Sequence, residues 1–177
     1  MRKIQNDELG RLSVEDFKLA PKKPFIIILD NIRSMNNIGS VFRTADAFRC
    51  TAIRLCGITA TPPHREIHKT ALGAEESVQW FYEKEIADVI ARLKSEGYIV
   101  AAVEQIEDGI SLEKFNPLPN KKYVFIFGHE INGISEEVIE LCDMFIEIPQ
   151  HGTKHSVNVA VAVGIVCWHF YFNSLIR

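Results

Sequence analysis

Three short segments of this chain combine glycine with polar side chains of the kinds that bind and orient a reacting group. Asn37 and Arg43 lie in "NIGSVFRTADAF", Glu130 lies in "FGHEING", and Ser156 and Asn158 lie in "IPQHGTKHSVNV". An arginine can hold a phosphate or stabilise developing negative charge, whereas carboxylate, amide and hydroxyl groups orient a substrate by hydrogen bonds. Three such segments in one chain predict a single shared pocket.

Each segment also has a purely structural interpretation. Arg43 lies opposite the apolar face of the helix expected over 37–48, so helix geometry alone favours a solvated arginine. Glu130 could be an exposed side chain in a turn that glycine permits. Ser156 and Asn158 could serve only to cap a helix. The occurrence of three such segments in one chain favours a shared functional site over three separate structural roles.

Known phosphate-binding loops do not explain these segments. After Gly128 and Gly133 come Ile134 and Ser135, so the spacing is neither G-x-x-x-x-G-K-[ST] nor G-x-G-x-x-G. The histidines at 151 and 155 have no further ligand at metal-binding spacing, so no metal is expected.

The elements that position these segments alternate between strand and helix. Apolar runs predict strands at 25–29, 52–56, 98–103, 123–127 and 144–148, with a shorter one at 77–82. Helices are expected over 37–48, 84–95, 135–142 and 156–172. This alternation predicts an α/β fold with a parallel sheet, whose ligands sit beyond the carboxyl ends of the strands.

Size and composition fit one domain with a real core, since the chain has 177 residues and 47% apolar residues. The net charge of −3 lacks the basic excess of many nucleic-acid binders, so RNA contacts would rest on local patches. One such patch is the basic N-terminal segment, which a solvated surface explains equally well. Four scattered cysteines and the lack of an apolar N-terminal run favour the cytoplasm.

The stretch 156–172 contains no charged side chain of Asp, Glu, Lys or Arg and is the one membrane candidate. Asn158 and His169 interrupt it, and its Ser- and Asn-containing start is typical of a helix N-terminus. We therefore expect no membrane span but a helix buried in the core or in a subunit interface.

At these motifs the sequence resembles the SpoU (TrmH-type) RNA ribose 2'-O-methyltransferases of the SPOUT superfamily. The family's Asn and Arg motif, its Gly-x-Glu-x-x-Gly motif and its Ile-Pro-x-x-Gly…Ser-x-Asn-Val motif all occur here in the family's order. The resemblance covers residues 25 to about 172. It implies a short N-terminal extension (1–24) followed by one methyltransferase domain (25–177).

The resemblance implies a Rossmann-like parallel sheet with a C-terminal deep trefoil knot. It implies S-adenosylmethionine as methyl donor and a ribose 2'-hydroxyl of structured RNA as acceptor, with tRNA favoured over rRNA. It also implies a homodimer that forms through the knot region and the C-terminal helix. Two alternatives stay open: a non-catalytic RNA-binding relative, and a plain nucleotide-binding α/β domain.

The resemblance also assigns roles to individual residues. Arg43 is the catalytic arginine, and Asn37, Glu130, Ser156 and Asn158 complete the catalytic side. The donor would bind Gly128, Ile148, Val157, Glu104 and Gln105, and RNA would bind Arg33, Lys154 and His155.

Three positions depart from the family pattern: Arg49 replaces a usual glycine, Ala160 a common serine, and His129 a variable position that is often Asn. The family mechanism makes the arginine a base. Because a guanidinium is effectively always protonated, an electrostatic role for Arg43 is easier to defend.

Overall fold

The computed structural model describes residues 1–174 and places seven strands in one sheet. The strands are β1 (Lys23–Asp30), β2 (Cys50–Cys56), β3 (Trp80–Glu83), β4 (Tyr98–Val103), β5 (Ile110–Ser111), β6 (Lys122–Phe127) and β7 (Met144–Glu147). The helices are α1 (Val14–Leu19), α2 (Met35–Ala47), α3 (Arg65–Ala71), α4 (Ala74–Ser77), α5 (Ile86–Ser95), α6 (Glu136–Ile139) and α7 (Val159–Asn173). Short 3-10 turns span Asn6–Leu9 and Leu112–Lys114.

The sheet has the order β3-β2-β1-β6-β4-β7-β5, and every adjacent pair of strands is parallel. The predicted parallel α/β fold is therefore confirmed. All carboxyl ends meet at one edge, which brings the loops after β1, β4, β6 and β7 together.

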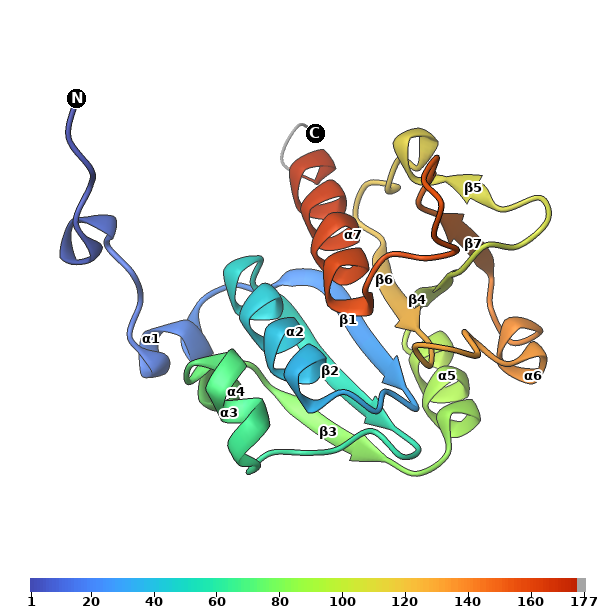
Figure 1. Cartoon of the computed structure of the whole chain (residues 1–177), viewed down its shortest axis with the longest axis horizontal. Coiled ribbons are helices and arrows are strands. Elements are labelled where there is room, and N and C mark those ends of the chain that lie inside the picture. The colour runs from blue at the N-terminus through green and yellow to red at the C-terminus, as the bar shows by residue number, and fades with distance from the viewer. Residues whose placement is uncertain (175–177) are drawn as a thin grey trace.

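Helices cover both faces of the sheet, which explains the continuous apolar runs of its strands (Figure 1). Phe25, Ile27 and Leu29 of β1 pack on one side with α1, α2, α3, α4 and α7. Ile26 and Ile28 of the same strand pack on the other side with α5 and α6.

Several element boundaries differ from the predicted ones. Helix α2 begins at Met35 rather than at 37, because the Ser34 hydroxyl caps it by accepting the Asn37 N–H (3.3 Å). Helix α7 begins at Val159 rather than near Ser156, because Asn158 is its cap and accepts the Ala160 N–H (2.9 Å). Ser, Asn and Asp cap equally well, so the sequence could not choose between neighbouring candidates.

Other predicted elements are shorter than expected, and some were missed. The helix over 135–142 is the single turn α6, the helix over 84–95 begins at Ile86, and the strand over 77–82 is β3. Helices α1, α3 and α4 and the two-residue strand β5 were not predicted. All four are short, and a short element contains too few residues for its hydrophobic periodicity to be recognised.

Helix α7 is buried on one face only. Its buried side chains are Val163, Val166, Cys167 and Phe170, whereas Val161, Ile165, Trp168 and Phe172 are 38% to 56% exposed. Within residues 1–174, no helix combines the length and the apolar content that crossing a bilayer requires.

Candidate active site

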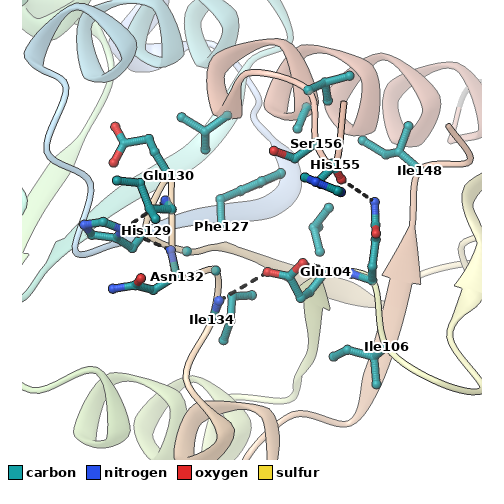
Figure 2. A pocket seen from close by; sticks show the side chains of 18 of the residues that line it. Glu104, Ile106, Phe127, His129, Glu130, Asn132, Ile134, Ile148, His155 and Ser156 are labelled. Atoms are coloured by element: carbon teal, nitrogen blue, oxygen red, sulfur yellow. Dashed lines mark hydrogen bonds between the residues drawn. The ribbon is translucent and has the colours of Figure 1, made fainter. Parts of the chain in front are cut away.

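A cavity of about 890 Å³, called the donor cavity below, opens at the carboxyl edge of the sheet (Figure 2). Its walls come from residues 103–106 at the end of β4, 127–136 at the end of β6, and Ile148, Gln150 and 155–159 between β7 and the start of α7. All five residues predicted to bind the donor line it: Glu104, Gln105, Gly128, Ile148 and Val157. Its volume suits a ligand of nucleoside size.

Glu130 joins the donor-cavity loop to the start of α2. One carboxylate oxygen accepts the N–H of Arg33 (3.1 Å), and the other accepts the N–H of Ser34 (3.0 Å) and the amide of Asn37 (3.3 Å). Partial burial raises the pKa of the Glu130 carboxyl, but these donors together lower it more, so its net pKa lies below the ordinary value. Glu130 is thus held as an anion.

Asn37 carries the network on to the third segment. Its side-chain oxygen accepts a hydrogen bond from the Asn158 amide (3.1 Å), across 121 positions of sequence. Asn158 in turn caps α7. Three predicted site residues from three segments, namely Asn37, Glu130 and Asn158, therefore form one hydrogen-bonded chain at the mouth of the donor cavity.

The loop that carries Glu130 is closed by its own backbone and by His129. The N–H and C=O of His129 bond the C=O and N–H of Gly133 (3.1 and 2.9 Å), and its Nδ1 accepts the N–H groups of Ile131 and Asn132. Gly133 has a φ of +65°, and a Cβ on Gly128 would lie 2.4 Å from the backbone of Gly133. Both glycines are required by this tight turn. The loop-closing role of His129 was missed, since its position looked merely variable.

Glu104 and Gln105 connect the end of β4 to both other walls of the cavity. The Glu104 carboxylate accepts the N–H of Gln105 (2.9 Å) and of Ile134 (3.2 Å). The Gln105 amide donates to the backbone oxygen of His155 (3.0 Å). The side chains after β4 therefore fix the relative position of the other two loops.

Arg43 is not among the residues that line the donor cavity. It lines a second cavity of about 450 Å³, together with Arg11, Arg49 and other residues of the N-terminal segment and of α2 to α4. Its exposed guanidinium has no hydrogen bond or ion pair with any described residue. Within the single chain, the predicted catalytic arginine and the predicted donor site therefore line different cavities.

The remaining predicted residues fall in three environments. Ser156 and His155 line the donor cavity, and the Ser156 hydroxyl has no partner among the described residues. Arg33 contributes its backbone N–H to Glu130, while its side chain is exposed. Lys154 is exposed and lies outside the cavity lining. Among residues 1–174, no group of His, Cys, Asp and Glu side chains has the arrangement of a metal site.

The profile of the SpoU rRNA methylase family matches residues 24–168, which include all three motif segments and every wall of the donor cavity. The chain belongs to this family. The resemblance read from the motifs is thereby confirmed.

Known members of the SpoU rRNA methylase family give the assignment its context. A 23S rRNA (guanosine-2'-O-)-methyltransferase RlmB from Nitrosomonas europaea is 31% identical over 147 residues, which are 79% of this chain and 53% of the relative. The chain spans about half to two thirds of the length of such curated relatives.

Two solved structures share the fold. The AdoMet-bound rRNA methyltransferase from Sinorhizobium meliloti matches with a TM-score of 0.78 at 24% identity, over 87% of this chain and 59% of that one. A structure described as giving insights into the 2-OH methylation of C/U34 on tRNA matches with a TM-score of 0.74 at 25% identity, over 86% of this chain and 97% of that one.

Proposed function

We propose that the chain is an S-adenosylmethionine-dependent methyltransferase that acts on a ribose 2'-hydroxyl of RNA. The observation that carries this proposal is that Glu130 and Asn158, which Asn37 joins by hydrogen bonds, both line the donor cavity. A methyl donor in the cavity and a hydroxyl held at that chain would lie side by side. Methyl transfer needs this proximity and orientation more than it needs a strong base.

In the proposed reaction the ribose oxygen attacks the methyl carbon, the carbon–sulfur bond breaks, and the hydroxyl proton leaves to solvent or to a substrate phosphate. The sulfonium becomes a neutral thioether. Glu130 and Asn158 orient the ribose, with Ser156 as a further hydrogen-bonding group. Arg43, which a second copy of the chain would supply in the dimer proposed below, stabilises the developing alkoxide and a neighbouring phosphate with its positive charge. RNA would be chosen over DNA because only RNA offers the 2'-hydroxyl.

We further propose a homodimer formed through α7 and a knotted C-terminal region. The exposed apolar side chains of α7 recur at spacings of 4, 3 and 4 residues, which places them in one stripe: Val161, Ile165, Trp168 and Phe172. An exposed apolar stripe of this kind is typical of a helix that packs on another. The last strand, β7, lies between β4 and β5, and the chain then returns to α7 beside α2, which supports the knot.

For the substrate we favour tRNA in the cytoplasm. The structure described as giving insights into the 2-OH methylation of C/U34 on tRNA matches over 97% of its own length at 25% identity, which supports this choice. For phosphate contacts we favour Arg33, Lys154 and His155, because all three are exposed and therefore accessible to RNA. Residues 25–177 would form the catalytic domain and residues 1–24 a short extension.

Two measurements test the proposal. Calorimetry should detect binding of S-adenosylmethionine, and mass spectrometry of RNA from a deletion strain should show the loss of one 2'-O-methyl nucleotide. The Arg43→Ala variant should bind the donor normally but lose at least about 100-fold in methyl transfer, the scale of an electrostatic contact in a transition state. Lys84→Ala, which removes an exposed charge elsewhere, is the matched control. Near-normal transfer by Arg43→Ala would refute both proposed roles of the arginine.

A further inference from the structure

The donor cavity is lined by acidic charge alone, apart from histidine. Its carboxylates are Glu104, Glu130 and Glu136. Among the lining residues, all within the described part of the chain, there is no lysine or arginine. A cavity of this charge attracts a cationic ligand.

Glu104 is the carboxylate that the structure fixes in the wall on the donor side. It is partly buried, and each of its oxygens accepts one backbone N–H, from Gln105 and from Ile134 (Figure 2). A Cβ on Gly133 would lie only 2.3 Å from the same carboxylate, so this side chain fills the space beside the loop. The negative charge therefore cannot swing freely into solvent.

The two other carboxylates are placed differently. The Glu130 carboxylate already accepts three hydrogen bonds from residues at or just before the start of α2. It lies on the side where the acceptor hydroxyl is proposed to bind. Glu136 is an exposed residue in the first turn of α6. Of the three, Glu104 is the partly buried carboxylate that lines the cavity away from the proposed acceptor side and is held in place by two wall amides.

We propose that Glu104 makes the donor cavity select its occupant by charge, favouring a cationic sulfonium nucleoside over the neutral thioether that remains after transfer. This inference rests on the proposed function. S-adenosylmethionine carries a sulfonium, an ammonium and a carboxylate, whereas S-adenosylhomocysteine has lost the sulfonium charge with the methyl group. The attraction to Glu104 therefore weakens at the moment of transfer, and the spent product leaves more readily than the donor.

The test compares the two ligands on the full chain by calorimetry. In Glu104→Gln the ratio of the dissociation constant of S-adenosylhomocysteine to that of S-adenosylmethionine should fall about tenfold, as expected for loss of one charge close to a ligand in a partly buried site. The Gln side chain also loses one of the two hydrogen bonds to the loops, but a looser loop would weaken the binding of both ligands by the same factor. The ratio therefore isolates the charge from the structural effect.

Two further variants complete the test. Glu104→Asp keeps the charge but shortens the side chain, so both dissociation constants should rise while the ratio stays near that of the unaltered chain. Glu137→Gln removes an exposed charge on α6 that does not line the cavity, and it should leave both constants unchanged. An unaltered ratio in Glu104→Gln overturns charge selection and leaves the proposed function standing. Failure of the unaltered chain to bind S-adenosylmethionine would instead refute the proposed function.

Discussion

Glu130 is the residue at which the separate segments of the site become one structure. Its three donors are the backbone N–H groups of Arg33 and Ser34, just before α2, and the side-chain amide of Asn37, through which it is linked to Asn158 in the third segment. The sequence predicted these residues because their types and order match a family motif. It could not predict that Arg43 lies beside another cavity, because helix periodicity gives a direction from the axis and not the neighbour found there.

The lowered pKa of Glu130 makes the site network sensitive to acid. Because the folded-state pKa lies below the ordinary value of 4.5, ionised Glu130 stabilises the fold above that pH, and the contribution is lost as the pH falls through the folded-state pKa. The difference in free energy of unfolding between the unaltered chain and Glu130→Gln should be constant above about pH 5 and shrink below it. Denaturant titrations at a series of pH values measure this difference. Asn37→Ala, which removes one of the three donors, should show a smaller effect, and a difference independent of pH would contradict the expectation.

At the scale of elements, strands were more predictable than helix ends. A strand covered on both faces must be apolar throughout, as β1 and β6 are, and that pattern survives in the sequence. Helix starts depend on which polar side chain reaches a free amide, so Ser34 rather than Asn36 or Asn37 caps α2.

The conformation of the turn after α2 could not be predicted from the residue type either. Arg49 replaces a usual glycine, yet the backbone keeps a glycine-type left-handed conformation with a φ of +52°.

This turn predicts a stabilising substitution. The Arg49 N–H bonds Asp46 O (3.1 Å), and its C=O accepts the N–H of Lys23 (2.8 Å), so the strained backbone is held between α2 and β1. Arg49→Gly should raise the free energy of unfolding by about 0.5–1 kcal/mol, since relief of the left-handed strain exceeds the added entropy of the unfolded chain. Chemical denaturation measures the change. Arg49→Ala keeps the Cβ and should give no such gain, and equal gains in both variants would show that the side chain rather than the backbone is responsible.

At the scale of the whole molecule, the donor cavity is built by one chain, whereas Arg43 and the stripe on α7 face elsewhere. Helices α2 and α7 pack against each other, and Phe48 just after α2 lies against Trp168 and Tyr171 of α7 (ring centroids 6.1 and 5.6 Å). The proposed dimer interface therefore adjoins the helix that carries Arg43. The sequence alone predicts that α7 is apolar. It does not predict which face of α7 the rest of the chain leaves exposed.

A charge placed in the stripe separates donor binding from methyl transfer. Ile165 is 38% exposed, and a glutamate there would have to be desolvated in the proposed interface, so Ile165→Glu should be monomeric at micromolar concentration in sedimentation experiments. The monomer should still bind S-adenosylmethionine, because a single chain supplies all three walls of the donor cavity. It should lose methyl transfer, because its own Arg43 lines a different cavity and, in the proposed dimer, the second copy would supply the arginine to the bound donor. Leu19→Glu, at an apolar residue of α1 that is 86% exposed, should stay dimeric and active. A dimer in Ile165→Glu would place the interface elsewhere, and an active monomer would show that Arg43 reaches the donor within its own protomer.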